Sequence, residues 1–283
     1  MSPTLTPPDP ELVRRDVERA LAEDIGAGDA TADLLPADAR ASARVITREE
    51  GVLAGRPWFD ACVRALDAGA RIEWNFADGD RISPDAVLCV VGARARALVS
   101  SERCALNFLQ TLSATATVTA QFASAVRGTR ATILDTRKTL PGLRGAQKYA
   151  VRCGGGNNHR LGLFDAILIK ENHIAAAGSL ASAVHAARAR HPDLMLEVEV
   201  ENFAELREAV GAGVDRIMLD EFDLEDIRRA VAEVDRRVPL EVSGGVSLET
   251  VSALAATGVD YISVGALTKH VRALDLSMRI TTS

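Results

Sequence analysis

The feature that most constrains the fold is a regular alternation of strand-length and helix-length segments after residue 128. Strand-length apolar runs recur, and stretches of helical periodicity lie between them. Strands that alternate with helices along a chain are parallel and are joined by crossover helices. The pattern therefore predicts a parallel α/β domain. The apolar runs occupy residues 131–136, 165–170, 194–200, 215–220, 239–245 and 260–265.

Almost every run ends in a polar residue or a glycine, and this favours a barrel over an open sheet. In α/β barrels the site lies at the carboxyl ends of the strands, and phosphate is often held after the last two. An open dinucleotide-binding sheet is disfavoured because no GxGxxG sequence follows a strand. Six runs are fewer than the usual eight strands, so we expect an incomplete barrel. The strand-end residues are Arg137, Lys138, Lys170, Glu199, Asp220, Ser243, Gly244 and Gly265.

The first hundred residues mix strands and helices without this alternation, which predicts a separate α+β domain. Asp9 can cap a helix that runs to about residue 22, and strands are expected near 41–47, 71–76 and 86–91. Residues 98–126 have a helical pattern. Its Ala-, Ser- and Thr-rich middle predicts either close packing or a break into two helices near Ser113. We place the boundary there, with residues 1–113 in the N-terminal domain and 114–267 in the barrel.

Composition excludes several classes of function. The formal net charge is −6 and aromatic residues make up 4%, so neither an extended basic face nor stacking platforms for nucleic acid are expected. No run approaches the ~18 apolar residues of a membrane span. The Pro-rich start, residues 1–11, lacks the apolar core of a signal peptide and is expected to be a frayed tail. The four cysteines have no zinc or disulfide spacing, which indicates reduced thiols in a cytoplasmic protein.

A basic stretch interrupts this acidic chain between Arg137 and Lys170. It holds seven Lys or Arg residues, those two included, and a single acid, Asp165. A local excess of cations in an acidic protein indicates a local anionic ligand. A solvated helix face would account for the cations of residues 144–152, but not for those that end apolar strands. The histidine and arginine at 159–160, which follow three glycines, extend the same anion site.

Two carboxylates are expected beside these cations. Alternate residues of a strand share a face, so Glu199 and Asp220 can both point into the barrel mouth near Lys138 and Lys170. One interpretation is a structural ion-pair network, since buried carboxylates need partners. A glycosidase would also use two carboxylates but would leave the cations unexplained. Because Gly and Ser after the last two strands can bring N–H groups to a phosphate, the residues favour an enzyme acting on an anionic, phosphorylated small molecule.

Longer motifs resemble one enzyme family, quinolinate phosphoribosyltransferase, also called nicotinate-nucleotide pyrophosphorylase (carboxylating). Residues 23–31 and 101–103 extend the resemblance over nearly the whole chain. The segments that carry it are TRKTLPGLR at 136–144, residues 148–174, EVEVEN at 197–202, MLDEF at 218–222, EVSGG at 241–245 and residues 260–280.

The resemblance implies transfer of a phosphoribosyl group from phosphoribosyl pyrophosphate to the nitrogen of quinolinate, with Mg²⁺ and no organic cofactor. Loss of the 2-carboxylate then gives nicotinate mononucleotide, CO₂ and pyrophosphate for NAD synthesis. The implied catalytic residues are Lys138, Lys170, Glu199 and Asp220, of which Glu199 and Asp220 would contact ribose hydroxyls or Mg²⁺. The implied quinolinate-binding residues are Arg103, Arg137, Thr139, His159, Arg160 and Lys170. The implied phosphoribosyl pyrophosphate-binding residues are Lys138, Glu199, Asp220, Ser243, Gly244, Gly245, Val264, Gly265 and Ala266.

The resemblance also implies an architecture and an assembly. It implies an N-terminal sandwich-like domain, an incomplete barrel, and a C-terminal segment, residues 268–283, that returns to the first domain. Residues 271–280 are apolar at helical spacing, which agrees with such a segment. Arg103 would reach the site of the other subunit of a homodimer. Two alternatives stay open: a relative of the same fold with another anionic substrate, such as the molybdenum-locus proteins, and a barrel that senses phosphorylated metabolites without catalysis.

Overall fold

The computed structural model describes residues 5–282, which form two compact units. Unit 1 contains residues 5–120, 140–155 and 270–282, and unit 2 contains residues 121–139 and 156–269. The boundary expected at 113/114 falls inside one continuous helix, α3 (Ala95–Ala125), so the chain does not break near Ser113. Residues 1–4 and 283, which the expected N-terminal domain and its returning segment include, lie outside the described residues.

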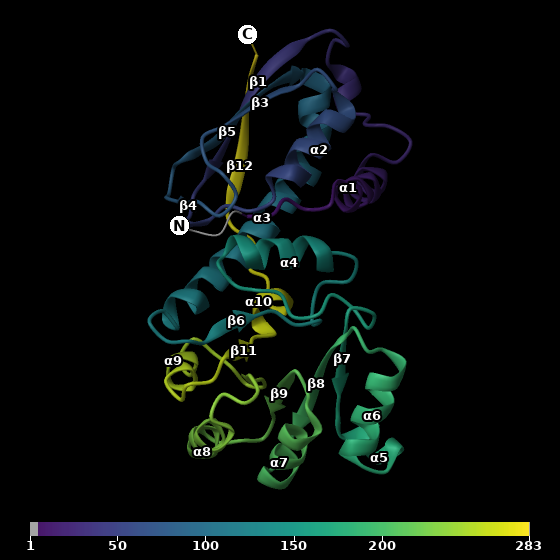
Figure 1. The fold of residues 1–283 in the computed structure, drawn as a ribbon. Coiled ribbons are helices and arrows are strands. Elements are labelled where there is room, and N and C mark those ends of the chain that lie inside the picture. Colours follow the sequence, from purple (N-terminus) through teal and green to yellow (C-terminus); the bar gives the residue numbers. More distant parts are fainter. Residues whose placement is uncertain (1–4, 283) are drawn as a thin grey trace. The chain divides into compact units, whose positions relative to one another are not determined.

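Unit 1 is built on a four-stranded antiparallel sheet with the order β12-β1-β5-β3 (Figure 1). Alternate residues of β1 are buried, as in a strand with one face on the core. Asp9 caps the first helix by accepting a hydrogen bond from the backbone N–H of Glu11 at 3.0 Å. The elements of unit 1 are α1 (Pro10–Ile25), η1 (Ala32–Leu34), β1 (Arg40–Thr47), β2 (Gly51–Val52), α2 (Arg56–Leu66), β3 (Arg71–Trp74), β4 (Arg81–Ile82), β5 (Val87–Arg94), most of α3, α4 (Arg144–Cys153) and β12 (Leu276–Thr282).

The C-terminal segment corrects one prediction. Residues 271–280 do not form a helix: β12 pairs antiparallel with β1, from Thr47 opposite Leu276 to Ala41 opposite Thr282. The period of two over Leu276, Met278 and Ile280 is the one that the structure uses. β1 pairs with β5 along one edge, and β12 pairs with its other edge.

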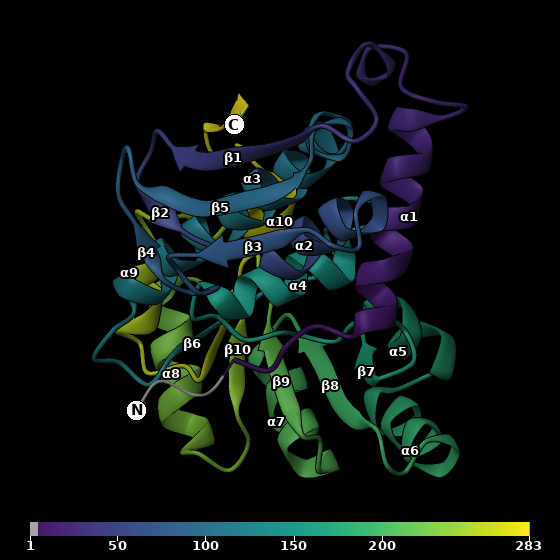
Figure 2. The same ribbon diagram turned by 90° about the horizontal axis from the view of Figure 1, so that it is seen from above.

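Unit 2 is built on a six-stranded parallel sheet with the order β6-β11-β10-β9-β8-β7. Its two end strands, β6 and β7, are not neighbours in the sheet, which confirms the predicted incomplete α/β barrel (Figures 1 and 2). All six predicted strands are present. The elements of unit 2 are the end of α3, β6 (Thr132–Leu134), β7 (Ala166–Ile169), α5 (Glu171–Ala177), α6 (Leu180–Arg190), β8 (Met195–Val200), α7 (Phe203–Ala212), β9 (Arg216–Leu219), α8 (Leu224–Val234), β10 (Leu240–Val242), α9 (Val251–Ala255), β11 (Tyr261–Ser263) and α10 (Ala266–Lys269).

Side-chain caps fix where the crossover helices begin. Ser179, Asn202 and Asp223 each accept backbone N–H groups at the start of α6, α7 and α8. Gly178 and Gly213, both in the left-handed conformation, end α5 and α7. Because the helix ends are fixed in this way, the loops that join strands and helices are short, and the residues that follow the strands are held in place.

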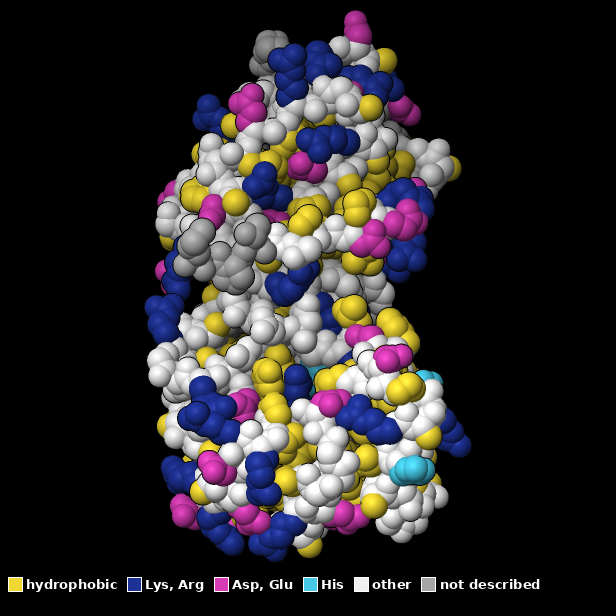
Figure 3. Space-filling view, viewed as in Figure 1, with side chains coloured by type: hydrophobic (Ala, Val, Ile, Leu, Met, Phe, Trp, Pro, Cys, Tyr) yellow, Lys and Arg dark blue, Asp and Glu magenta, His cyan; other side chains and the backbone are white. Residues whose placement is uncertain are grey.

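The surface agrees with the charge pattern of the sequence. On the face seen in Figure 3, Lys and Arg side chains are interspersed with Asp and Glu, without one large basic patch. Among residues 5–282, no helix combines the length and the apolar character that crossing a membrane requires.

Candidate active site

The carboxyl ends of the parallel strands of unit 2 place the predicted residues along one edge of the sheet. The pairing of Ile169 with Val198 puts Lys170 next to Glu199, and the pairing of Val200 with Leu219 puts Asp220 one position beyond β8. The residues that follow β10, β11 and β6 leave from the same edge because all these strands are parallel. The predicted residues at this edge are Lys138, Lys170, Glu199, Asp220, Ser243, Gly244, Gly245, Val264, Gly265 and Ala266.

Lys170 and Glu199 are in direct contact, with the Lys170 ammonium on Oε2 of the glutamate. The Glu199 side chain is 8% exposed and that of Lys170 is 42% exposed, so the cation faces solvent while the carboxylate is buried. The backbone N–H of Lys170 donates to Nδ1 of His173 at 3.0 Å, which fixes the start of α5. Lys170 and Glu199 thus form an ion pair at the carboxyl ends of β7 and β8.

Arg160 and Arg137 are neighbouring cations. The Arg160 guanidinium donates to the carbonyl oxygen of Ala166 at 3.2 Å. Burial and then the charge of Arg137 lower the pKa of Arg160, and Glu197 and Asp165 oppose this. Two guanidinium groups that repel each other in a partly buried place are stabilised by an anion with more than one negative charge.

The Lys138 segment is held by hydrogen bonds on both sides. Its N–H donates to Thr136 Oγ1 at 3.1 Å, and its carbonyl oxygen accepts from Thr268 Oγ1 at 2.8 Å. A Cβ atom on Gly265 would lie 3.2 Å from Cδ of Lys138, so the absence of a side chain lets the lysine pass over this glycine. Thr139 follows, with its N–H donating to the carbonyl of Arg137 at 3.0 Å.

The loop after β10 gives the edge a glycine turn. Gly244 and Gly245 have φ values of +90° and +60°, which favour glycine, and both are exposed. A Cβ on Gly244 would lie 3.6 Å from an Asp220 carboxylate oxygen, so this loop is close to the acid. The short helix α10 begins directly after Gly265.

Carboxylates gather near the end of β8. A small cavity of about 190 Å³ is lined by Glu171, Glu199, Glu201 and Glu205 together with apolar residues of α5. Desolvation first, and then the charges of these glutamates and of Asp220, raise the pKa of Glu201. The cluster has the oxygen ligands that a hard divalent cation prefers.

His159 was predicted to contact quinolinate, but its ring is buried and points toward the strands of the sheet. Its side chain is 7% exposed. Nδ1 accepts the backbone N–H of Arg160 at 2.7 Å, and Nε2 lies 2.9 Å from Oε2 of Glu197 and 3.6 Å from Oε1 of Glu241. A direct contact between this ring and quinolinate stays a prediction.

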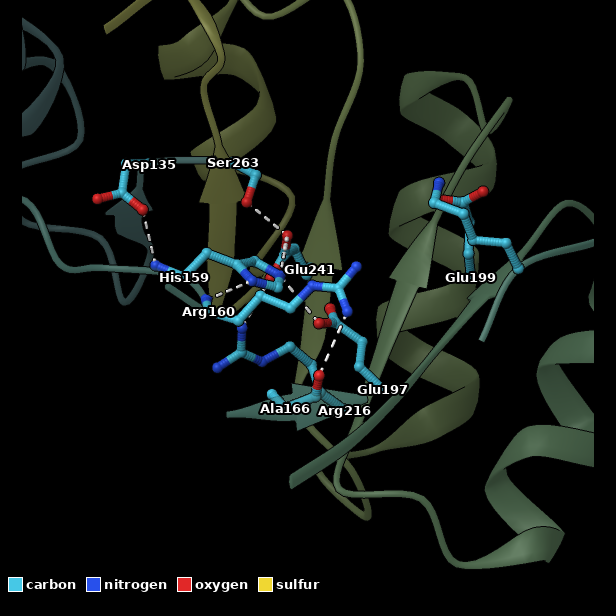
Figure 4. A network of polar contacts seen from close by, with 10 residues as sticks. Asp135, His159, Arg160, Ala166, Glu197, Glu199, Arg216, Glu241 and Ser263 are labelled. Atoms are coloured by element: carbon cyan, nitrogen blue, oxygen red, sulfur yellow. Dashed lines mark hydrogen bonds and ion pairs between the residues drawn. The ribbon is translucent and has the colours of Figure 1, made fainter. Parts of the chain in front are cut away.

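Sequence reasoning missed a buried polar layer below the predicted site (Figure 4). We call His159, Glu197, Arg216, Glu241 and Ser263 the inner layer. Glu241 accepts from Arg216 at 2.8 Å and from the Ser263 hydroxyl, and Arg216 stacks 4.1 Å from the centre of the Tyr261 ring. One signal could have found it: Glu197, Glu241 and Ser263 each stand two residues before a predicted site residue, on the same face of the strand.

Burial changes the acidity of this layer. The pKa of Glu197 is raised by burial. Burial and then the charge of Glu197 raise the pKa of Glu241 to about 7, against the opposing effects of His159, Ser263 and Arg216. The neighbouring His159 and Arg216 therefore offset only part of the cost of burying these two acids inside the barrel.

Arg103 lies on α3 in unit 1, away in sequence from the other predicted residues. It is exposed and lines a cavity of about 570 Å³ together with side chains of α1 and the turn at residues 141–143. Its predicted role is in the site of another subunit.

The fold and the strand-end residues define the class: an α/β-barrel enzyme site for an anionic, phosphorylated substrate. The sequence profile "Quinolinate phosphoribosyl transferase, C-terminal domain" matches residues 115–279, and that of the N-terminal domain matches residues 29–113. The first match begins and the second ends within helix α3.

Similar proteins span nearly the whole chain. The nicotinate-nucleotide pyrophosphorylase (carboxylating) of Mycobacterium leprae is 45% identical, with 95% of this chain and 97% of the relative covered. A probable enzyme of the same name from Bacillus subtilis is 41% identical over 92% of this chain and 91% of the relative. The solved nicotinate-nucleotide pyrophosphorylase of Francisella tularensis has a TM-score of 0.93 and 44% identity, over 99% of this chain and 100% of that one. The chain belongs to the quinolinate phosphoribosyltransferase family, which confirms the resemblance seen in the sequence.

Proposed function

We propose that unit 2 carries out the decarboxylating quinolinate phosphoribosyltransferase reaction at the carboxyl ends of its strands. Phosphoribosyl pyrophosphate and quinolinate give nicotinate mononucleotide, CO₂ and pyrophosphate, in NAD biosynthesis. One observation carries the assignment of the site: cations follow the two end strands, β6 and β7, and the carboxylates of β8 and β9 lie at the same edge of the parallel sheet, in a chain of this family. The neighbouring cations Arg137 and Arg160 match a substrate with two carboxylates.

Quinolinate would bind at the cations of β6, β7 and the 157–160 segment. The planar fork of Arg137 and of Arg160 suits one carboxylate each, and Lys170 adds a third cation at the mouth. Thr139, beside Arg137, would contribute a hydroxyl. Arg103 of the partner subunit would complete the pocket.

Phosphoribosyl pyrophosphate would bind across the ends of β9, β10 and β11. Lys138 would contact the pyrophosphate, because its side chain runs over Gly265 toward this edge. Backbone N–H groups of residues 243–245 and 264–266 would hold the 5′-phosphate. Glu199 and Asp220 would contact the ribose hydroxyls.

The side chains act by electrostatics, without a covalent intermediate on the protein. As the bond between C1 of the ribose and pyrophosphate breaks, positive charge develops on the ribose ring, and Glu199 and Asp220 stabilise it while Lys138 stabilises the leaving anion. The quinolinate nitrogen then bonds to C1 and becomes cationic. The positive charge on this nitrogen stabilises the electron pair that remains at C2 when CO₂ leaves, and C2 then takes up a proton. The adduct is thus its own electron sink.

The carboxylates also fit a magnesium ion. Mg²⁺ binds oxygen ligands, keeps several waters and is often held by one or two carboxylates and substrate phosphates. Glu199 and Asp220 would hold it, and the neighbouring acids, whose charges add to desolvation in raising the pKa of Glu201, give this place an excess of negative charge. When bound, the ion would neutralise charge on the pyrophosphate group.

We further propose that the protein is cytoplasmic. All four cysteines are buried free thiols, as in a reducing compartment.

We also propose a homodimer in which each subunit supplies Arg103 to the site of the other. This sharing can be tested by mixing inactive Arg103→Ala and Lys138→Ala proteins under conditions that exchange subunits. In a two-fold dimer that shares Arg103, about a quarter of the wild-type sites are restored. A mixture that stays inactive although mixed dimers form would contradict the sharing.

Substrate selection tests the proposed function. The protein is incubated with phosphoribosyl pyrophosphate, Mg²⁺ and either quinolinate or nicotinate, which lacks the 2-carboxylate, and nicotinate mononucleotide is measured by chromatography. We expect product from quinolinate and far less from nicotinate, because one carboxylate leaves part of the cation set without a partner. Product from nicotinate alone, or from neither, would refute the proposal.

A further inference from the structure

The inner layer lies directly below the residues that the proposed function uses. Glu197, Glu241 and Ser263 occupy the positions two residues before Glu199, Ser243 and Gly265 on β8, β10 and β11. Arg216 faces Glu197 across the ladder between β8 and β9. Side chains of α/β barrels fill the interior in such layers, usually with branched apolar residues. Here the layer is charged, so burial has a cost that apolar residues would avoid.

The contacts of His159 determine where its proton lies. The backbone amide of Arg160 is a donor, and Nδ1 accepts from it at 2.7 Å, so Nδ1 carries no proton. A neutral ring then has its proton on Nε2, which faces the carboxylates of Glu197 at 2.9 Å and Glu241 at 3.6 Å. Because the lone pair of Nδ1 accepts the amide and Nε2 of a neutral ring carries the proton, the ring has no lone pair to offer a metal ion, although it and the two carboxylates lie close together.

The same ring connects the layer to Arg160. His159 donates its own backbone N–H to Oδ1 of buried Asp135 at 2.9 Å, and Asn157 forms a bridge with Leu134 of β6. The segment is therefore held by β6 on one side and by the imidazole on the other. Its next residue, Arg160, is also fixed at its guanidinium by the Ala166 carbonyl.

We propose that Glu197 and Glu241 are positioning residues for quinolinate binding: they hold His159 in the tautomer with its proton on Nε2, and His159 thereby holds the backbone of Arg160. Arg216 and Ser263 keep Glu241 oriented through its two oxygens. This inference rests on the proposed function for the identity of the ligand, but the tautomer of His159 does not depend on it. If the carboxylates were removed, the ring could rotate or change tautomer, and the N–H of Arg160 would lose its acceptor.

Binding experiments on the full-length protein test the positioning role. We compare Glu241→Ala and Glu241→Gln with Val198→Ala, a change at a fully buried position of β8 whose side chain points to the opposite face of the sheet. Affinities for quinolinate and for phosphoribosyl pyrophosphate are measured separately by calorimetry. Loss of the well-placed hydrogen bonds from Arg160 to a carboxylate is expected to weaken quinolinate binding on the order of 10- to 10²-fold. Glu241→Ala should show this loss with donor binding unchanged, and Glu241→Gln, which keeps an oxygen for Arg216, should recover most of it.

The control separates positioning from stability. Val198→Ala should lower the melting temperature and leave both affinities unchanged. If Glu241→Ala does not fold, Ser263→Ala, which removes only the hydroxyl on Glu241, is the milder variant and should weaken quinolinate binding in the same direction. Two results would overturn the inference. One is an equal loss of affinity for quinolinate and for phosphoribosyl pyrophosphate. The other is an unchanged affinity for quinolinate in all three variants, Ser263→Ala, Glu241→Gln and Glu241→Ala.

Nitrogen NMR supplies a readout that needs no substrate. In protein labelled at histidine, the signal that disappears in His159→Gln identifies this residue among the five histidines. For the wild type we expect the ring-nitrogen chemical shifts of a neutral imidazole with its proton on Nε2. In Glu241→Ala we expect these shifts to change. A proton on Nδ1 in the wild type would overturn the inference. A wild-type enzyme that binds quinolinate but forms no product would instead refute the proposed function and leave the positioning role standing.

Discussion

Glu241 should make the stability of unit 2 depend on pH. Its side chain is fully buried, and burial together with the charge of Glu197 raises its pKa from the ordinary 4.5 to about 7. The folded protein therefore binds this proton more tightly than the unfolded chain does. The contribution to stability is fully present below pH 4.5 and is lost as the pH rises through about 7.

The magnitude follows from the shift. Each pKa unit corresponds to about 1.4 kcal/mol, so the shift corresponds to a loss of about 3 kcal/mol in the free energy of unfolding across this window. Glu241→Gln removes the titrating group and leaves one acid, Glu197, against one cation, Arg216. The amide also keeps an oxygen that can accept from Arg216. We therefore expect this variant to lack that part of the decline between pH 5 and 7.5.

Urea unfolding followed by circular dichroism at several pH values measures this effect. Both tryptophans, Trp58 and Trp74, lie in unit 1, so their fluorescence would not report on the barrel. Asp193→Asn is the control, since this acid is exposed in the loop between α6 and β8. Its curve should run parallel to that of the wild type. If Glu241→Gln also runs parallel, the acid is not protonated in the folded state near neutral pH and the reasoning fails.

Three further predictions concern the site. Arg137→Ala and Lys170→Ala should each lower turnover on the order of 10²–10³-fold with unchanged circular dichroism, because each removes one fixed charge; a near-normal rate for either would refute its role. Gly265→Ala should raise the KM for phosphoribosyl pyrophosphate, since the new Cβ would lie 3.2 Å from Lys138 Cδ. The control, Gly211→Ala, has open space around it in α7 and should have wild-type kinetics. Equal KM values for the two variants would contradict a role of the close approach between Gly265 and Lys138. Removal of Mg²⁺ with a chelator should abolish turnover, and Glu199→Gln or Asp220→Asn should raise the Mg²⁺ concentration for half-maximal rate; full activity in the chelator would exclude the metal.

The parallel barrel was predictable because its signal is local and repeated. Each strand is a short apolar run, each helix has its own period and cap, and the polar residue at each strand end stands out against the run before it. β12 was not predictable in this way. Residues 271–280 are compatible with two periods, and the choice is made by the edge of β1, more than 200 residues earlier in the chain.

The inner layer could be anticipated only in part. That Glu197 and Glu199 share a face follows from the period of a strand. That His159 turns its ring to Glu197 and Glu241 does not, because this depends on the 157–160 segment bridging to β6. Sequence motifs pointed to the residues expected to meet ligand, and the contacts that hold those residues are distributed over five segments of the chain.

The most direct test of the account uses quinolinate labelled in its 2-carboxylate. CO₂, pyrophosphate and nicotinate mononucleotide are measured in the same reaction, with and without phosphoribosyl pyrophosphate. If the ribosylated ring nitrogen is the electron sink, CO₂ release requires the donor, and the three products form in equal amounts. Release of CO₂ without the donor, or pyrophosphate without CO₂, would contradict it.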